Sequence, residues 1–162
     1  MTVIKRLLKV SQKISPKITI IIDNREKNPY TFKSIDPPPE IISQTLQEGD
    51  YSLYNHEKEI TIERKSLIDA FGTFGKNRKR FERELERMVD YKFAAVVIEG
   101  GWTDILRSPP PQSKLNPTTI FHSVVAWCQR YNVHFFTVPN RAFGEKLTYR
   151  LIERFWRDRG DE

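Results

Sequence analysis

The sequence predicts an α/β fold in which helices cover both faces of a central β-sheet. Short apolar, β-branched runs alternate with longer segments whose apolar residues recur at helical spacing, an alternation typical of such sheets. The continuous apolar run Phe93–Glu99 has the pattern of a strand buried on both faces. With 162 residues, 38% of them hydrophobic, the chain can bury one core. We therefore expect a single domain over residues 17–159, preceded by a basic, mobile arm at residues 1–16.

The first half of the expected domain contains three strands and one short helix. Residues 17–23 have the β-branched composition of a strand. After a turn-rich segment with three consecutive prolines, residues 41–47 are predicted to form a short helix that Gly49 closes. Two further strands, at residues 51–54 and 59–65, are expected to be joined by a short polar turn.

The second half is predicted to be mostly helical, with strands at residues 93–99 and 133–138. From Ser66 the pattern turns helical, and apolar residues continue at that spacing to Val89. Asn116-Pro117 has the signature of a helix start, with an N-cap and a proline at the first helical position. A last helix is expected to carry the apolar residues Phe143, Leu147, Leu151, Ile152 and Phe155.

The charge of the chain favours a polyanionic partner. There are 27 lysines and arginines against 21 aspartates and glutamates, a net charge of +6, so nucleic acid comes first and an anionic membrane surface second. The longest apolar runs are only strand-sized and no secretory signal is visible. Cys128 is the single cysteine, which excludes a disulfide framework and a cysteine-based metal cage. We expect an intracellular protein, cytoplasmic or DNA-associated, without a transmembrane segment.

The expected strand at residues 59–65 is the most informative part of the sequence. Because side chains alternate along a strand, Glu63 and Lys65 should share one face at its end. The preceding turn should bring Asp50 near the same place. Two carboxylates beside a lysine offer hard oxygen ligands, which suit Mg²⁺ or Mn²⁺ and are poor for zinc. Taken singly, Glu63 and Lys65 could be a surface charge pair, and Asp50 a turn residue.

Two further acidic residues have both a structural and a functional interpretation. Ser66 and Asp69 have the spacing of a capping box, in which Asp69 stabilises the start of a helix. That role is compatible with a place in a site. Asp23 and Arg25 follow the first strand, where they form either a loop ion pair or a second carboxylate with its phosphate-binding partner.

These charged residues also have a characteristic spacing. Twelve residues separate Gly49-Asp50 from Glu63-Arg64-Lys65, and three more separate that triplet from Asp69. This GD…ERK…D pattern resembles the signature of the XPF-type nucleases. Upstream, Asp23-Asn24-Arg25-Glu26 is similar to the D-x-R-E segment of that family. The resemblance covers roughly residues 18–155, nearly the whole chain.

The resemblance implies a restriction-endonuclease-like core with a central mixed β-sheet. It further implies a Mg²⁺- or Mn²⁺-dependent endonuclease that cuts DNA near junctions or flaps. Asp50 and Glu63 would be metal ligands, with Asp23 as a further one, and Lys65 would be the water-orienting base. The implied catalytic set is Asp23, Arg25, Asp50, Glu63, Arg64, Lys65 and Asp69.

Partners follow from the same resemblance and from the charge pattern. Lys76, Arg78, Lys79 and Arg80 form a net-basic patch near the expected site, where we expect contacts to DNA phosphates. Beyond Arg80, we interpret the mixed charges as a solvated helix with i,i+4 pairs. Many family members carry a tandem helix-hairpin-helix domain after the nuclease domain, and no such module is visible in this sequence. We expect the domain to work alone, as a homodimer, or with a partner protein that recognises DNA structure.

Two other classes of function stay open at the level of sequence. The first is a catalytically silent DNA-binding or dimerisation module of the same fold, which has no reason to keep Asp50, Glu63, Lys65 and Asp69 together. The second is a basic membrane-surface or RNA-binding protein, which does not account for the carboxylates.

Overall fold

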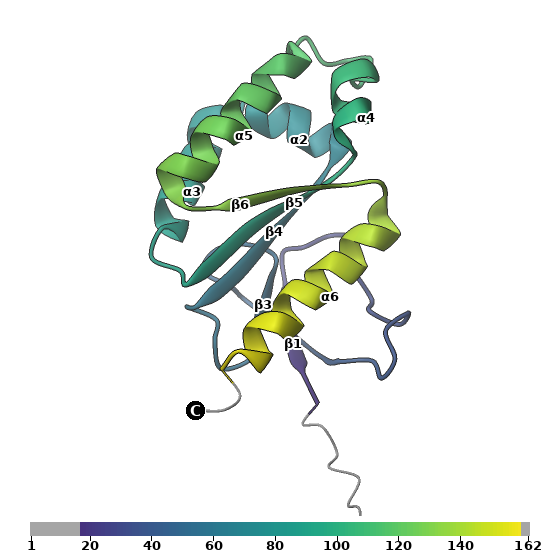
Figure 1. Cartoon of the computed structure of the whole chain (residues 1–162), viewed down its shortest axis with the longest axis vertical. Helices are drawn as coiled ribbons and strands as arrows, with labels where there is room; N and C mark the ends of the chain where they lie inside the picture. Colours follow the sequence, from purple (N-terminus) through teal and green to yellow (C-terminus); the bar gives the residue numbers. More distant parts are fainter. Residues whose placement is uncertain (1–16, 160–162) are drawn as a thin grey trace, which may run out of the picture.

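The computed structural model describes residues 17–159, so the expected N-terminal arm lies outside the described residues. Figure 1 shows how the elements are arranged. In chain order they are β1 (Thr19–Asp23), β2 (Glu40–Gln44), β3 (Tyr51–Leu53), β4 (Ile60–Ser66), α2 (Leu67–Phe74), α3 (Arg78–Met88), β5 (Phe93–Glu99), α4 (Trp102–Arg107), α5 (Pro117–Tyr131), β6 (His134–Val138) and α6 (Arg141–Arg157).

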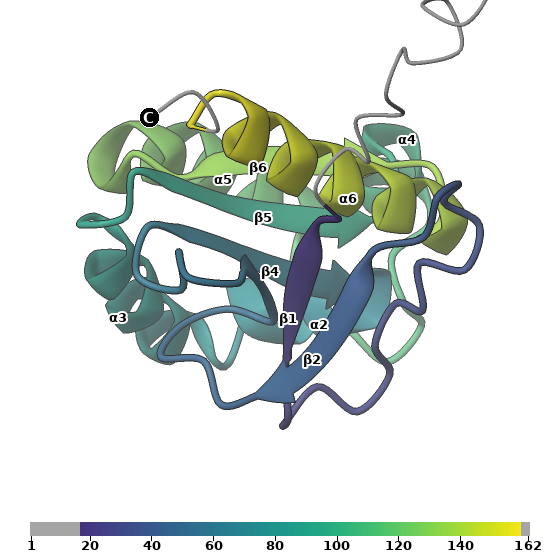
Figure 2. The same ribbon diagram turned by 90° about the horizontal axis from the view of Figure 1, so that it is seen from below.

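Within the described residues, six strands form one mixed sheet in the order β2-β1-β3-β4-β5-β6. β1 and β2 are parallel, as are β4, β5 and β6, and the antiparallel β3 joins the two groups. Tyr51, the first residue of β3, pairs with Ile22 of β1 on one side and Ile62 of β4 on the other. Figure 2 shows β1 and β2 crossing β4 and β5 at a steep angle, because the sheet is strongly twisted.

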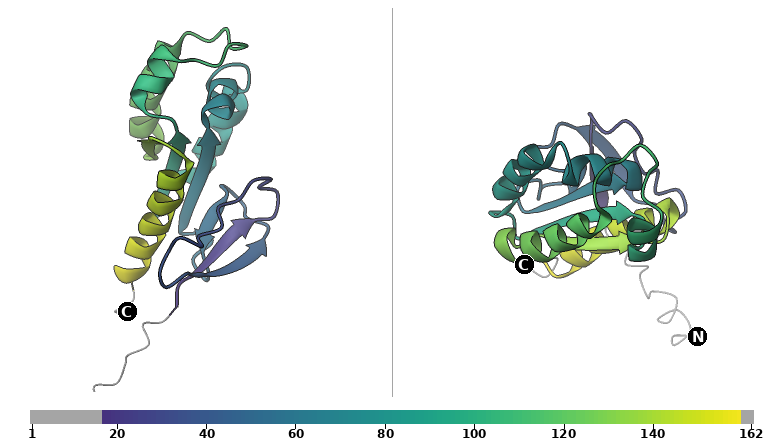
Figure 3. Two further views of the ribbon diagram at one scale, coloured as in Figure 1. Left: turned by 90° about the vertical axis from the view of Figure 1, so that its right-hand side faces the viewer. Right: turned by 90° about the horizontal axis from the view of Figure 1, so that it is seen from above.

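Apolar residues on the two faces of the sheet form two cores. One contains Ile60 and Ile62 of β4 together with residues of α6. The other contains Val96 and Ile98 of β5 together with residues of α2, α3, α4 and α5. Figures 1 and 3 show these four helices grouped together, with β1 at the opposite end of the molecule from α4. The predicted α/β fold, with a mixed sheet and helices on both faces, is confirmed.

One predicted element is wrong. Residues 41–47 do not form a helix; instead, Glu40–Gln44 form β2, an exposed edge strand parallel to β1. The β-branched pair Ile41-Ile42 favours a strand, and Glu40 N donates a hydrogen bond to Ile18 O (2.9 Å), which fixes the start of the pairing. An edge strand of five exposed residues has no alternation of buried and exposed positions to identify it.

The starts of the helices follow local capping. Ser66 Oγ accepts a hydrogen bond from Asp69 N (3.1 Å), and the Asn116 side chain caps α5, as the sequence predicted. Sequence reasoning missed the short helix α4. It begins after Gly101, whose N–H donates to Asp104 Oδ2 (3.0 Å).

Candidate active site

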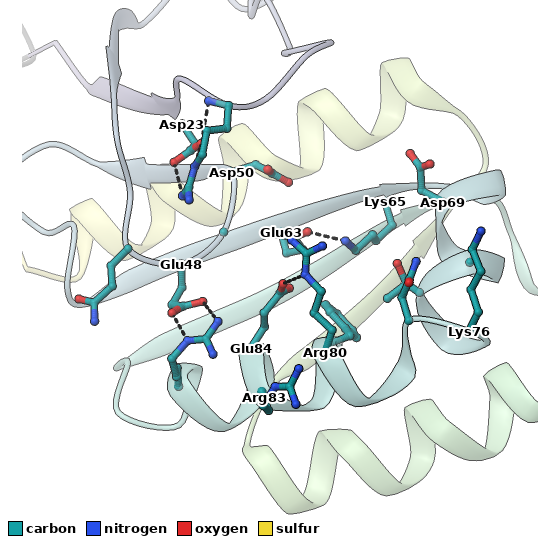
Figure 4. A pocket seen from close by; sticks show the side chains of 18 of the residues that line it. Asp23, Glu48, Asp50, Glu63, Lys65, Asp69, Lys76, Arg80, Arg83 and Glu84 are labelled. Carbon is teal, nitrogen blue, oxygen red and sulfur yellow. Dashed lines mark hydrogen bonds and ion pairs between the residues drawn. The ribbon is translucent and has the colours of Figure 1, made fainter.

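A cavity of about 920 Å³ lies beside the sheet, between β4 and the helices α2 and α3. Figure 4 shows the side chains that line it. Its charged residues come from β4, α2, α3, the segment that follows β1 and the turns that precede β3 and α3. They include Arg25, Glu48, Asp50, Glu63, Lys65, Asp69, Lys76, Arg80, Arg83, Glu84 and Arg87.

The alternation of β4 places Glu63 and Lys65 on the cavity side, as the sequence predicted. Lys65 Nζ lies 2.6 Å from Glu63 Oε1, and the two side chains are only 15% and 12% exposed. Figure 4 shows them side by side. Arg64, between them, projects to the opposite face. The Glu63–Lys65 pair is shielded from water. The other interpretation of these two residues, an exposed charge pair on the surface, therefore does not apply.

A tight turn brings Asp50 to the same cavity. Gly49 has a φ of 75°, and a Cβ atom there would lie 2.1 Å from Thr61 Oγ1, so only glycine fits. Asp50 N donates to Ile62 O (2.9 Å). The Asp50 carboxylate in turn accepts a hydrogen bond from Arg64 N through Oδ2 (2.7 Å). The backbone of β4 therefore binds both the main-chain N–H and the carboxylate of Asp50.

The carboxylates of the cavity repel one another. Burial and the charge of Glu63 raise the pKa of Asp50 well above its ordinary value. The same two causes raise the pKa of Glu84. Burial lowers the pKa of Lys65, but the charge of Glu63 and its hydrogen bond, together with Asp50, more than offset this, so the pKa of Lys65 is raised. Lys65 is thus a charged donor, and the site favours a further cation.

Asp23 lines the same cavity, but its carboxylate is already fully hydrogen-bonded within the protein. Its carboxylate is buried and accepts four N–H groups: two from the Arg25 side chain (2.8 and 2.9 Å), one from Arg25 N (2.8 Å) and one from Leu46 N (2.8 Å). Two hydrogen bonds on each oxygen use the acceptor capacity of the carboxylate. Asp23 therefore holds Arg25, whose side chain is 65% exposed at the cavity.

Arg64 belongs to a buried network behind the cavity. Its guanidinium binds Glu99 through two hydrogen bonds (2.6 and 3.0 Å), and Tyr30 Oη donates to the same carboxylate (2.7 Å). Two further ion pairs extend the network: Arg64 Nη1 lies 3.7 Å from Glu26 Oε1, and Arg141 Nη1 lies 3.8 Å from Glu99 Oε1. Arg64 is thus a supporting residue that does not reach the cavity.

Asp69 combines the two interpretations that the sequence left open. Ser66 Oγ accepts from Asp69 N, so Ser66 caps α2, but the reciprocal bond of a capping box is replaced: Asp69 Oδ2 accepts from the Ser66 hydroxyl (2.7 Å) and not from the Ser66 backbone N–H. Asp69 also lines the cavity, where its exposed side chain stands at the start of α2 (Figure 4).

The expected DNA-binding patch divides into two. Lys76 and Arg80 line the cavity. Arg78 is turned away from it: Nη1 donates to Ser123 Oγ (2.5 Å), and the guanidinium lies 4.4 Å from the centre of the Trp127 ring. Lys79 is exposed and outside the lining of the cavity. The start of α3 at Arg78 decides this division, because it sets which side chains face β4.

Sequence reasoning missed Glu48, Arg83, Glu84 and Arg87, all of which line the cavity. The last three lie three, four and seven residues after Arg80, so they share one face of α3 with it. That spacing is visible in the sequence, but the mixed charges fit a solvated helix equally well. Glu48 gave no local signal.

The donor set fits a hard divalent cation. Within residues 17–159, no three His, Cys, Asp or Glu side chains gather closely enough to hold a metal on their own. Mg²⁺ typically uses one or two carboxylates and takes its other ligands from water and substrate phosphates. Asp50 and Glu63 supply two. Burial and the charge of Glu63 raise the pKa of Asp50, and a bound cation would favour its ionised form.

Comparison with known families is consistent with this geometry. The family model described as the ERCC4 domain matches residues 22–151, most of the chain. The chain belongs to the ERCC4-domain family. The matched part of this ERCC4 domain contains all seven residues of the expected catalytic set, and the identification as an XPF-type nuclease domain is confirmed.

Solved structures show the same fold. XPF from Aeropyrum pernix is 16% identical, with a TM-score of 0.66 over 83% of this chain and 60% of that chain. A second structure, XPF from Aeropyrum pernix in complex with DNA, is 17% identical, with a TM-score of 0.67 over 88% of this chain and 67% of that chain. This chain thus covers about three fifths of the length of the first of those chains and two thirds of the second.

No curated protein matches this ERCC4 domain. In the part of the chain that the structure describes, no helix has the length and apolar character needed to cross a membrane.

The network behind the cavity predicts a pH-dependent stability. Burial would raise the pKa of Glu99, but hydrogen bonds from Arg64 and Tyr30 outweigh it and hold the pKa below its ordinary value of 4.5. A carboxyl with a lowered folded pKa stabilises the fold above its ordinary pKa, and that contribution is lost as the pH falls through the folded pKa. We expect Glu99→Gln to lower the free energy of unfolding at pH 7 by about 3 kcal/mol, because Arg64 loses its charged partner.

Urea unfolding between pH 7 and pH 3 measures this effect. The difference between the wild type and Glu99→Gln should narrow as the pH falls below 4.5. Glu86→Gln, which removes an exposed carboxylate from α3, is the control and should match the wild type throughout. A difference that stays constant with pH would contradict the assignment.

Proposed function

We propose that this ERCC4 domain is a metal-dependent DNA endonuclease that hydrolyses phosphodiester bonds. The observation that carries the proposal is the convergence of Asp50 with the Glu63–Lys65 pair in one charged cavity (Figure 4). Arginines and a lysine on the other wall give the cavity the charge that a phosphate backbone needs. A silent module of the same fold has no physical reason to hold two repelling carboxylates beside a buried lysine.

In this proposal Asp50 and Glu63 hold Mg²⁺ or Mn²⁺. The bound cation would polarise the scissile phosphate and lower the pKa of a water molecule. Lys65, which carries its proton, donates hydrogen bonds to the attacking water or to a phosphate oxygen and so orients the reaction. Asp23 keeps the Arg25 guanidinium directed to the cavity, where it binds phosphate. Asp69 completes the site at the start of α2.

The wall formed by Lys76, Arg80 and Arg83 binds the DNA backbone. Lys76 and Arg83 have no carboxylate partner within 4 Å among residues 17–159, and the nearest carboxylate to Arg80 is Glu84 at 3.6 Å. The charges of Lys76 and Arg83 are therefore available to phosphates, while Arg80, whose side chain is 80% exposed, shares its charge with Glu84. Such contacts position DNA without reading its sequence. The solved XPF from Aeropyrum pernix in complex with DNA supports this choice of ligand.

Selectivity for branched or flap DNA, and a homodimer or partner protein, are finer parts of the same proposal. Leu106, Phe121 and Val125 are exposed apolar side chains on α4 and α5. They support a contact with a second copy or with a partner that recognises DNA structure.

Cleavage tests the proposal directly. Labelled duplex, flap, fork and single-stranded DNA are incubated with the protein in Mg²⁺, Mn²⁺ or EDTA. We expect cutting only with metal, and a loss of at least about 100-fold in Asp50→Asn and Lys65→Ala, because each loses a group that acts on the reacting phosphate or water. Folding and DNA affinity should be kept, and Glu86→Gln should cut as the wild type does. Cutting that survives Asp50→Asn contradicts the assignment, and binding without any cutting favours the silent module.

DNA affinity tests the cationic wall, with two arginines of α3 as a matched pair. Arg83→Ala should weaken binding of a fluorescent duplex and reduce the slope of log K against log salt by about 0.9, because one phosphate contact is lost. Arg78→Ala should leave the slope unchanged and lower the melting temperature, because Arg78 packs on Trp127. Anisotropy titrations in EDTA at several salt concentrations measure both. If both variants lowered the salt slope equally, the proposal that Arg83 contacts DNA phosphates and Arg78 does not would be contradicted.

A further inference from the structure

The turn that carries Asp50 is bound to α3 by an ion pair of its own. Glu48, two residues before Asp50, has a side chain that is only 7% exposed. Its two carboxylate oxygens accept hydrogen bonds from Nε and Nη2 of Arg87, the second at 3.1 Å. Figure 4 shows Glu48 at the edge of the cavity. A bidentate arginine–carboxylate pair fixes orientation as well as distance, so Glu48 is held in one place relative to α3.

The main chain of the same turn is held by β4. Thr61 Oγ1, which is fully buried, donates to Glu48 O (2.7 Å). Gly49 follows in a conformation that no other residue fits, and Asp50 N donates to Ile62 O (2.9 Å). The backbone of the turn is therefore fixed from β4 and its side chain from α3. Asp50 follows these attachments by two residues and is itself bound to β4 through its N–H.

We propose that Glu48 and Arg87 are positioning residues that place the Asp50 carboxylate opposite Glu63. Without Arg87, the Glu48 carboxylate would be a buried charge with no partner. The Glu48 carboxylate would then rotate toward water, and this movement would displace the backbone turn that carries Asp50. Removing a residue that orients a metal ligand typically lowers metal affinity roughly 10- to 100-fold. The inference rests on the proposed function, because it assigns Asp50 to the cation.

The sign of the effect separates this role from simple electrostatics. Removal of a positive charge from the cavity wall should by itself strengthen the binding of a cation. Arg83→Ala removes the same charge from the same helix without touching Glu48, so it measures that effect. Arg87→Ala is expected to weaken Mn²⁺ binding by about tenfold or more, in the opposite direction.

Isothermal titration of Mn²⁺ into the DNA-free protein measures the affinities. Glu48→Gln and Arg87→Ala should each weaken binding, and the double variant should be no weaker than the weaker single one, because both break one interaction. Arg87→Lys keeps the charge but cannot make the bidentate pair with Glu48, so its Mn²⁺ affinity should lie between those of the wild type and Arg87→Ala. It also serves if Arg87→Ala fails to fold.

Two results would overturn the inference. One is Mn²⁺ binding that is unchanged or tighter in Arg87→Ala, as expected for Arg83→Ala. The other is an additive loss in the double variant. Failure of the proposed function itself is a different result: the wild type binds no Mn²⁺, or Asp50→Asn binds it as well as the wild type does.

Discussion

The buried ion pair between Arg64 and Glu99 is the interaction on which the geometry of the site depends. The two side chains are 8% and 9% exposed, and a buried charge without a partner is strongly destabilising. The pair forms only when β4 and β5 keep their parallel register. A slip of one residue along β4 would exchange its two faces and send Lys65 into the place of Arg64. By fixing Arg64 behind the sheet, the pair fixes Glu63 and Lys65 in front of it.

In the cavity, unlike at the Arg64–Glu99 pair, carboxylates outnumber the buried cations that could neutralise them. Asp50, Glu63 and Glu84 line it together with the buried Lys65, and burial together with the charge of Glu63 raises the pKa values of Asp50 and Glu84. The fold tolerates this repulsion because the turn that carries Asp50 is hydrogen-bonded to the backbone of β4 and, through Glu48, to Arg87 of α3. A site that is strained by like charges is suited to bind a cation and, with it, a phosphate.

The parts that depend on local periodicity could be predicted from the sequence, and the others could not. Alternation along β4 was sufficient to pair Glu63 with Lys65, and Asn116 identified the start of α5. The edge strand β2 could not be predicted, because its five residues are all exposed and show no alternation. The direction of Arg78, toward Trp127 and away from the cavity, depends on its position at the first residue of α3, where the preceding turn decides which way the side chain points. The pairing of Glu48 with Arg87 joins residues 39 positions apart, and no local pattern reports it.

The central claim is that Asp50 and Glu63 share one divalent cation. Anomalous diffraction from crystals grown with Mn²⁺ tests it most directly, because the signal locates the metal without any assay of activity. We expect a single strong peak between the two carboxylates, beside Lys65, and no peak there in crystals of Asp50→Asn. A peak bound elsewhere on the protein, or an empty cavity at saturating Mn²⁺, would contradict the account.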